Sequence, residues 1–401
     1  MAKQNKPAIR FKGFTDAWEQ RKVGEVSESY SGGTPSVGVK EYYGGQIPFI
    51  RSAEINSEIT ELFLTEEGLK NSSARLVAVG DILYALYGAT SGEVGRARLK
   101  GAINQAILAI KPHTDYDSEY LAQWLRKSKH SIIDTYLQGG QGNLSGTIVK
   151  ELSVDFPSLK EQKAIGGFFR QLDNLITLHQ RKYDKLQVLK KAMLEKMFPK
   201  NGSSVPEIRF KGFTDAWEQR KLGDNIVEYT EVTTENNQYP PLTSSRKGIF
   251  LQTEYFAGNQ IASDDNTGYN IVPYGYFTYR HMSDDEVFHF NINDIVEKGI
   301  VSTLYPVFTT DENLDSRYLQ YQLNYGHEFA KFAILQKQGG SRTYMYLNKL
   351  RQLHLTMPNH VEEQKAISSF FMNLDHLITL HQRELEKLQN IKKSMLEKMF
   401  V

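Results

Sequence analysis

Residues 161–198 read EQKAIGGFFRQLDNLITLHQRKYDKLQVLKKAMLEKMF, and residues 363–400 repeat this stretch as EQKAISSFFMNLDHLITLHQRELEKLQNIKKSMLEKMF. In both copies, apolar residues recur at alternating steps of four and three, which is the heptad pattern of a helix that packs on another helix. The apolar seam comprises Ile165, Phe169, Leu172, Ile176, Leu186 and Met193 in the first copy, and Ile367, Phe371, Leu374, Ile378, Leu388 and Met395 in the second. Each helix, at roughly 38 residues, is about 57 Å long.

We expect these two helices to pack on each other, and to run antiparallel if a pseudo-twofold axis relates the two halves of the chain. The alternative is that each helix packs on a partner protein. Pro157-Ser158 precedes the first helix and Pro358-Asn359 precedes the second. Glu161 follows three residues after the serine, and Glu362 three residues after the asparagine, which is the spacing of a capping box. We therefore expect both glutamates to cap their helices.

The chain is a tandem duplication in which only part of each half is copied. IRFKGFTDAWEQRK at 9–22 recurs without a mismatch at 208–221. The segments between the repeats, roughly 26–156 and 225–357, are similar in length and differ in detail. A repeat of this kind divides the chain into a first globular domain (1–157), a first long helix (158–199), a second globular domain (200–357) and a second long helix (358–401).

The divergent segments have the patterns of mixed domains. GDILYALYG at 80–88 and INQAILAIKP at 103–112 are short apolar runs bounded by glycine and proline, as expected of strands. The segment 117–137 places apolar residues near one helical face behind the capping residue Asp117. Segments 272–282 and 315–335 occupy the corresponding places in the second half. We therefore expect α/β (α+β) globular domains in tandem, joined by the two long helices as an antiparallel coiled coil.

The composition limits the function classes. The 401 residues include no cysteine, which excludes disulfides and thiolate zinc sites. No uncharged apolar stretch reaches the roughly 18 residues of a transmembrane helix, and the first residues lack the apolar run of a signal peptide. We therefore expect a soluble, cytoplasmic protein. With 48 basic and 47 acidic residues, the total charge neither demands nor excludes a nucleic-acid partner.

Catalytic signatures are missing from the sequence. No Gly-Lys dipeptide occurs, which excludes a Walker phosphate loop, and the double proline in NQYPPLT at 237–243 lacks the flanking residues of an adenine methyltransferase motif. Asp155, Glu161 and Lys163 have the residue types of a nuclease site, but the second half has no aspartate matching Asp155. We expect no catalytic residue, no bound metal and no cofactor in this chain.

Loops in the divergent segments carry side chains able to contact DNA. The candidates in the first half are Arg51, Arg96, Arg98, Lys100, Gln141, Asn143 and Ser145; those in the second half are Arg246, Lys247, Arg280, His281, Ser341, Arg342 and Tyr344. Each loop alone is equally well a solvated turn. Taken together, corresponding loops change their donors and acceptors between the halves, as two readers of different DNA targets require.

Several motifs give the chain a family resemblance. They are Trp18 followed by Val23-Gly24, SGGTPS at 31–36, YYGGQIPFIRSAEI at 42–55, Gly-Asp at 80–81, Asn-Gln at 104–105, and FPSLKEQKAI at 156–165. With these motifs the chain resembles the specificity subunit of Type I restriction–modification enzymes over essentially its whole length. The second divergent segment departs from the pattern because it lacks counterparts of GGTP and YYGG.

The resemblance implies a division of labour. Two target recognition domains would each read one half of a bipartite, asymmetric site in double-stranded DNA, and the long helices would form the spacer between them. The repeated regions would recruit two methyltransferase (modification) subunits, which two restriction (motor–nuclease) subunits would join. Adenine methylation, cleavage, S-adenosylmethionine, ATP and magnesium would belong to these partners. The alternatives are a free-standing DNA-modification enzyme and a coiled-coil scaffold that does not bind DNA.

Overall fold

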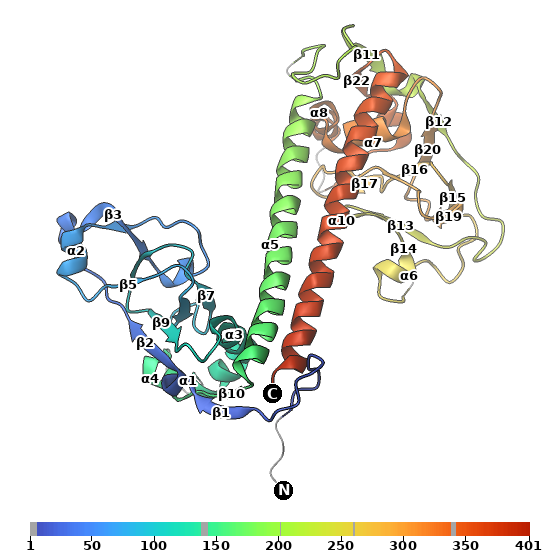
Figure 1. The fold of residues 1–401 in the computed structure, drawn as a ribbon. Helices are drawn as coiled ribbons and strands as arrows, with labels where there is room; N and C mark the ends of the chain where they lie inside the picture. The colour runs from blue at the N-terminus through green and yellow to red at the C-terminus, as the bar shows by residue number, and fades with distance from the viewer. Residues whose placement is uncertain (1–5, 138–142, 201, 260, 338–341) are drawn as a thin grey trace. The chain divides into compact units, whose positions relative to one another are not determined.

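The computed structural model describes residues 6–137, 143–200, 202–259, 261–337 and 342–401 (Figure 1). The chain divides into two compact units. Unit 1 comprises Met1–Arg181 with Gln382–Val401, and unit 2 comprises Lys182–His381. Each unit therefore contains one globular domain together with the start of one long helix and the end of the other. This division arises because each long helix contributes its two ends to different units.

Unit 1 contains two four-stranded sheets. Its strands are β1 (Glu19–Lys22), β2 (Ser27–Ser31), β3 (Tyr43–Ile50), β4 (Phe63–Leu64), β5 (Arg75–Val77), β6 (Ile82–Ala85), β7 (Val94–Arg96), β8 (Gly101–Ile103), β9 (Ile107–Pro112) and β10 (Ser153–Phe156). The first sheet has the order β2-β9-β6-β7 and the second has the order β4-β3-β8-β5, while β1 pairs with β10. The strands predicted within 80–88 and 103–112 are confirmed as β6 and β9.

The helices of unit 1 are distributed over both four-stranded sheets. They are α1 (Val23–Val26), η1 (Lys40–Tyr42), η2 (Ser52–Glu54), α2 (Glu66–Lys70), α3 (Ser118–Tyr136), α4 (Gly146–Glu151) and the start of α5 (Leu159–Lys196). The predicted cap of α3 is confirmed, since the Asp117 carboxylate accepts a hydrogen bond from the Tyr120 amide at 2.9 Å. Leu121 and Leu125 of α3 are buried in one apolar cluster with Ile82 and Ile110 of the sheet.

Unit 2 has a counterpart of the first sheet of unit 1 with shorter strands, and its other strands form two-stranded pairs. The strands of unit 2 are β11 (Glu218–Lys221), β12 (Ile226–Glu228), β13 (Leu242–Ser245), β14 (Gly248–Leu251), β15 (Asn270–Pro273), β16 (Phe277–Thr278), β17 (Met282–Ser283), β18 (Asn291–Ile292), β19 (Lys298–Val301), β20 (Val307–Thr310), β21 (Thr343–Tyr344) and β22 (His354–Met357). A four-stranded sheet has the order β12-β20-β16-β18. The remaining strands pair as β11 with β22, β13 with β14, β15 with β19, and β17 with β21.

The helices of unit 2 differ from those of unit 1 at one break. They are η3 (Leu222–Asp224), α6 (Gln252–Tyr255), α7 (Ser316–Tyr325), α8 (His327–Leu335), α9 (Leu347–Leu350) and the start of α10 (Val361–Met399). The segment that matches the single helix α3 is split into α7 and α8 at Gly326, which is extended (φ −76°, ψ 142°). A Cβ at this position would lie 2.3 Å from the Gln322 carbonyl oxygen, so the break favours glycine.

Within each unit, the start of one long helix packs on the end of the other. In unit 1, Phe169 of α5 stacks on Phe400, with ring centroids 5.8 Å apart, and Asp173 of α5 forms an ion pair with Lys392 of α10 at 2.6 Å. In unit 2, Phe371 of α10 stacks on Phe198 at 6.1 Å. Lys190 of α5 pairs there with Asp375 of α10. In each of these contacts, one residue lies near the start of one long helix, and the other lies near or just after the end of the other helix.

The apolar seam lies at these contacts. Ile165, Phe169 and Leu172 are buried in unit 1, where Leu388 and Met395 pack against the same cluster. Ile367, Phe371 and Leu374 are buried in unit 2, where Leu186 and Met193 pack against them. Ile378 is buried and Ile176 is half-buried. The seam therefore joins each pair of helix ends to the core of a globular domain.

The prediction that Glu161 and Glu362 cap the long helices is wrong. The Glu161 carboxylate instead accepts hydrogen bonds from Nε and Nη2 of Arg10, at 2.6 and 2.7 Å, and its side chain is 1% exposed. Within the described residues, Glu362 makes no bond back to Asn359; it is exposed, whereas its neighbour Glu363 is buried. A bidentate guanidinium is a stronger partner for a buried carboxylate than a backbone amide, so the repeated head segment takes the place of the cap.

In unit 2 the Glu363 carboxylate accepts hydrogen bonds from Nε and Nη2 of Arg209, at 2.6 and 2.8 Å. It also accepts a hydrogen bond from the Trp217 indole N–H at 3.2 Å. The repeated head also packs Phe11 on Phe168 and Phe210 on Phe370. Part of the identity between residues 9–22 and 208–221 therefore comes from internal contacts with the long helices.

Candidate nucleic-acid interface

The two divergent loops predicted to carry DNA contacts are built on one backbone scaffold. In unit 1 the Leu144 amide donates to the Leu86 carbonyl at 2.8 Å, and α4 begins two residues later. In unit 2 the Met345 amide donates to the His281 carbonyl at 2.7 Å, and α9 begins two residues later. Leu144 and Met345 are both buried. This register matches Asn143 with Tyr344, and Ser145 with Tyr346.

Side chains alternate between the inside and the outside along residues 342–346. Arg342, Tyr344 and Tyr346 are exposed, whereas Thr343 and Met345 are buried. This alternation follows from the period of two in extended backbone. We call the three outward side chains the 342–346 strip. The tyrosine rings of the strip lie nearly parallel, at 12° and 5.9 Å between centroids.

Tyr346 was missed by the sequence analysis. Its position two residues beyond Tyr344 and four beyond Arg342 is the signal that could have found it, because alternate residues of a strand share one face. His281 lies against Tyr346, with ring centroids 4.8 Å apart, and is 7% exposed. Burial lowers the pKa of the His281 imidazole below its ordinary value, so this ring is neutral and supports the tyrosines.

The other candidates of unit 2 surround a short acidic turn. Asp284 accepts a hydrogen bond from Arg342 Nε at 2.9 Å, and Asp285 pairs with Arg246. Arg246 and the exposed Arg280 line a cavity of about 260 Å³ together with Ser283 and Asp284. The Arg246 guanidinium, followed by a hydrogen bond from the Ser283 hydroxyl, holds the pKa of the Asp285 carboxyl well below its usual range.

The structure thus brings Arg246, Arg280, His281, Arg342 and Tyr344 into one region of unit 2. Lys247 is exposed at the turn between β13 and β14 and lines a neighbouring cavity of about 370 Å³ with Arg246. Two candidates, Gln141 and Ser341, lie outside the described residues.

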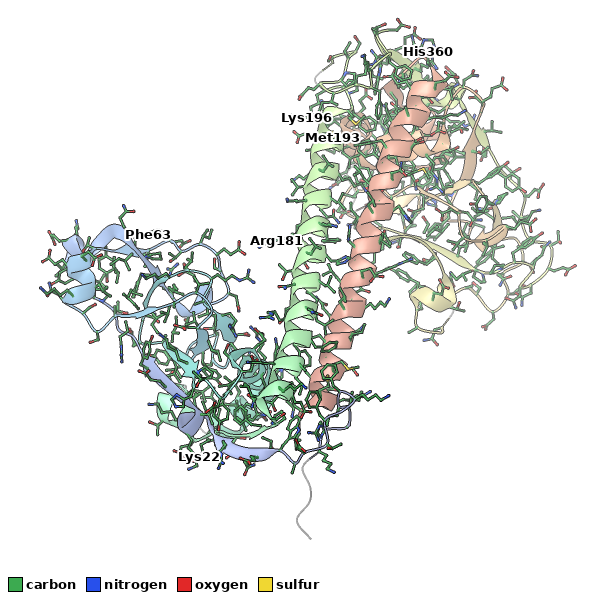
Figure 2. The ribbon with its side chains drawn as sticks, in the orientation of Figure 1. Lys22, Phe63, Arg181, Met193, Lys196 and His360 are labelled. Atoms are coloured by element: carbon green, nitrogen blue, oxygen red, sulfur yellow. The ribbon has the colours of Figure 1, made fainter. Side chains whose placement is uncertain are left out.

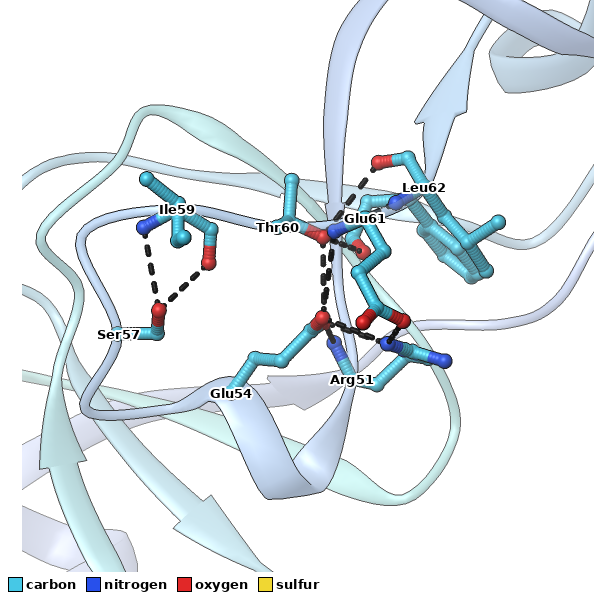
Figure 3. A network of polar contacts seen from close by, with 8 residues as sticks. Arg51, Glu54, Ser57, Ile59, Thr60, Glu61 and Leu62 are labelled. Carbon is cyan, nitrogen blue, oxygen red and sulfur yellow. Dashed lines mark hydrogen bonds and ion pairs between the residues drawn. The ribbon is translucent and has the colours of Figure 1, made fainter. Parts of the chain in front are cut away.

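The three arginine candidates of unit 1 are engaged by carboxylates of their own domain. Arg51 donates through Nε to Glu54 at 3.2 Å, and through Nη2 to Glu54 and Glu61, each at 2.7 Å (Figure 3). Arg98 donates to Glu58 at 2.7 Å, and Glu58 also accepts from Arg181 of α5, which is labelled in Figure 2. These ion pairs tie the 51–61 segment to its neighbours within unit 1.

Some of the remaining candidates of unit 1 make hydrogen bonds within the domain, and others are exposed. Arg96 donates to the Ser118 hydroxyl at 3.0 Å and to Glu119 at 3.3 Å, at the start of α3. Ser145 caps α4 by accepting a hydrogen bond from the Ile148 amide at 3.2 Å. Asn143 and Lys100 are exposed. Arg96 and Ser145 therefore have structural partners, while Asn143 and Lys100 present their side chains outward.

Replacing Glu54 by glutamine is expected to lower the free energy of unfolding by about 1–2 kcal/mol at pH 7. This is less than the loss expected of a fully buried ion pair, because the side chains of Arg51 and Glu61 are exposed to solvent, which screens the interaction. Partial burial alone raises the pKa of Glu54, but hydrogen bonds from the Arg51 side chain and from the Arg51 and Glu61 backbone lower it to about 2. A depressed carboxyl pKa stabilises the fold above the ordinary pKa of 4.5 and loses that effect as the pH falls towards 2.

Urea denaturation of the wild type and the variant at pH 7, 5 and 3 measures this effect. The difference between the two proteins should shrink as the pH is lowered below about 4.5. A deficit of the same size at every pH would contradict the ionic role of Glu54. Glu61→Gln is the matched control, because the Glu61 side chain is 82% exposed and should contribute less.

The described residues contain neither a metal-ligating cluster nor a helix suited to a membrane. Across the described ranges, no three or more histidine, aspartate or glutamate side chains come together as a metal site. The helices in the described part of the chain include none that is long and apolar enough to span a bilayer. Glu161, whose residue type and spacing from Asp155 suit a nuclease set in the sequence, is instead paired with Arg10.

Comparison with known proteins gives one consistent result. The family described as "Type I restriction modification DNA specificity domain" matches residues 15–188 and again 215–390. The chain is 23% identical over 413 residues to the Type I restriction enzyme MjaVIII specificity subunit of Methanocaldococcus jannaschii, covering 94% of this chain and 91% of that protein. It is 28% identical over 274 residues to the MjaIX specificity subunit of the same organism, where the match covers 62% of each chain.

Among solved structures, the S subunit of a Type I restriction–modification system from M. genitalium matches with a TM-score of 0.64 at 13% identity, covering 99% of both chains. At this identity the likeness establishes the fold. The mixed α/β fold, the family match in each half and the relatives of similar length agree with one another. The chain therefore belongs to the family of Type I restriction–modification DNA specificity subunits and carries the specificity domain twice.

Proposed function

We propose that this chain selects the DNA sequence on which a Type I restriction–modification complex acts, with each globular domain reading one half of a bipartite, asymmetric site. The observation that carries the proposal is the pair of matched loops. The same backbone scaffold presents Asn143 and Ser145 in unit 1, but Tyr344 and Tyr346 in unit 2. A shared scaffold with different outward side chains is what two readers of different half-sites need.

The repeated surfaces would dock two copies of one partner, the methyltransferase subunit. Internal contacts account for Arg10 and Phe11 of the head, and in unit 2 also for Asp215 and Glu218, which contact His360 and Asn359 just before α10. They do not account for Lys12 and Thr15, which are exposed, as are their identical counterparts Lys211 and Thr214. Identity at exposed positions of a repeat supports a common external partner. Two restriction subunits would join the complex through this core.

The long helices would form an antiparallel spacer with pseudo-twofold symmetry. The two ion pairs between them support a single register: Asp173 and Lys190 are 17 residues apart on α5, and their partners Lys392 and Asp375 are 17 residues apart on α10. Half-sites read from one face of B-DNA lie about 34–36 Å apart, a distance that helices of this length can span.

The chemistry of the complex would belong to the partners. In this proposal the chain contributes recognition and assembly, at the DNA in the cytoplasm, while adenine methylation with S-adenosylmethionine and ATP-dependent cleavage with magnesium take place in the methyltransferase and restriction subunits. Residues 1–157 and 200–357 are then the two target recognition domains, and residues 158–199 and 358–401 are the spacer helices.

The test is to co-express the chain with a cognate methyltransferase subunit and to map methylated adenines across a genome. The expected result is a split motif with a fixed gap, of which one half changes when residues 26–156 are exchanged for those of a relative. Exchange of residues 225–357 is the matched variant and should change the other half alone. A stable complex that methylates no specific motif would overturn the proposal in favour of a scaffold without a DNA role.

A further inference from the structure

We infer that Arg342 reads a guanine in the half-site of the second recognition domain, and that Asp284 is a positioning residue that orients the Arg342 guanidinium for this contact. The inference deepens the proposed function and rests on it. Neither residue belongs to the repeated regions, so both are free to differ between the two readers.

The nitrogen used in the ion pair decides what Arg342 can do. A guanidinium carries five N–H donors in a planar fork. Asp284 accepts from Nε at 2.9 Å, which leaves the terminal nitrogens Nη1 and Nη2 side by side at the end of the side chain. Guanine presents two acceptors, O6 and N7, side by side in the major groove, and a bidentate arginine is the commonest specific contact to them.

The other candidate arginines are held differently. Arg51 is engaged through both Nε and Nη2, whereas Arg98 and Arg96 each donate through Nη1 and Arg246 donates through Nη2. Each of these contacts uses an N–H group of a terminal nitrogen. Among the candidate arginines with an ion pair in the described part of the chain, Arg342 is the one whose ion pair uses Nε and no terminal nitrogen.

The backbone beneath Arg342 is well fixed. Tyr344 of β21 pairs with Met282 of β17, and the Met345 carbonyl accepts a hydrogen bond from the buried Tyr279 hydroxyl at 2.8 Å. Tyr344 follows Arg342 on the same outward face, and its ring stacks on that of Tyr346. The hydrogen bond to Asp284, and then its negative charge, raise the pKa of the Arg342 guanidinium, which therefore stays charged.

Asp284 lies in a turn that is held by hydrogen bonds to the following residue, Asp285. Asp285 accepts a hydrogen bond from the Ser283 hydroxyl at 2.8 Å and from the Val287 amide at 3.3 Å, in addition to its pair with Arg246. The Arg342 and Asp284 side chains are 51% and 72% exposed, so their ion pair contributes little to stability. Its effect is to restrict the orientations of an exposed arginine before DNA arrives, which improves binding by lowering the ordering cost.

In the register that matches Leu144 with Met345, the residue corresponding to Arg342 is Gln141, so the first domain has no arginine at this position of its sequence. Asn143 and Ser145 stand where the second domain has Tyr344 and Tyr346, and Ser145 is used to cap α4. A guanine contact of the Arg342 kind is therefore expected in one half-site, the one that changes when residues 225–357 are exchanged.

The experiment uses the full chain assembled with its methyltransferase subunit. Wild type, Arg342→Ala, Arg342→Lys and Asp284→Ala complexes are compared by methylation mapping, and by competition binding to synthetic duplexes that differ at one G·C pair of the second half-site. Arg342→Ala should reduce the preference for guanine at that position by roughly tenfold to a hundredfold. Arg342→Lys should lose a similar preference because lysine has no planar fork. Asp284→Ala should reduce it by roughly two- to tenfold.

Glu286→Gln is the matched control, because Glu286 lies on the same turn and pairs with Lys337 rather than with Arg342. It should leave the motif unchanged. Co-purification of each variant with the methyltransferase subunit shows that it is folded. An unchanged motif in Arg342→Ala would overturn the inference. So would a loss of affinity of the same size for every sequence, accompanied by a shallower salt dependence, since that result identifies a phosphate contact.

The wild-type complex distinguishes failure of the proposed function from failure of this inference. If it methylates no split motif, the proposed function fails. If it methylates a split motif that every Arg342 variant also recognises, only the assignment of Arg342 and Asp284 fails.

Discussion

Replacing Glu363 by alanine is expected to lower the free energy of unfolding by about 3–5 kcal/mol, the usual cost of removing one partner of a buried ion pair. The Glu363 side chain is 1% exposed and that of Arg209 is 12% exposed, so the guanidinium would be left without its carboxylate away from water. The Trp217 indole N–H would lose its acceptor as well. Denaturant unfolding followed by tryptophan fluorescence measures the change.

Two variants sharpen this prediction. Glu362→Ala removes an exposed carboxylate from the adjacent position of α10 and should change stability by less than about 0.5 kcal/mol. Glu161→Ala removes the equivalent carboxylate in unit 1, where the Trp18 indole N–H has no hydrogen-bond partner in the described structure. Its effect should be smaller than that of Glu363→Ala by about 1 kcal/mol. A change at Glu363 no larger than at Glu362 would contradict the structural role of this contact.

Inserting one heptad into α5 after Arg181 is expected to abolish methylation at the wild-type site. Seven helical residues add about 10 Å to one helix. With α10 unchanged, the pairing of Asp173 with Lys392 and that of Lys190 with Asp375 cannot both keep their register. The measurement is the methylation map of the complex, together with co-purification of the methyltransferase subunit.

A double variant with a second heptad inserted into α10 after His381 is the matched control for folding. It restores the register of both ion pairs and should assemble with the methyltransferase subunit. Because the two recognition domains would then stand about 10 Å further apart, it should also lose methylation at the original gap. An unchanged recognition site in the assembled double variant would rule out a spacer role for the helices.

The sequence predicts the structure correctly where its pattern is local and periodic. The two long helices, the strands β6 and β9, and the Asp117 cap of α3 all depend on neighbours within a few residues, and each is present in the structure. The capping role of Glu161 and Glu362 was also a local prediction, and it was wrong. The true partner of Glu161 is Arg10, which is 151 residues away in the chain.

The candidate DNA contacts show the same division. The loops were found because their composition differs between the halves, but their roles depend on distant partners. Arg96 and Arg51 are occupied by glutamates of their own domain, whereas Arg342 is held through one nitrogen by Asp284, 58 residues earlier. The sequence also could not distinguish the buried His281 from the exposed Tyr344, because both occur in polar, loop-like segments.

The amino-acid sequence by itself determined the duplication, the two long helices and the mixed α/β class of each half, because these follow from repeats and short-range periodicity. Its motifs indicated the family by resemblance. The tertiary structure alone decided which carboxylate pairs with which arginine. It places Arg10 and Arg209 of the repeated head segments in ion pairs at the starts of the long helices. It also places Arg342, Tyr344 and Tyr346 on one outward face. The physical reason is that an ion pair needs atoms within a few ångströms of each other, and residues far apart in the chain reach that distance only through the fold.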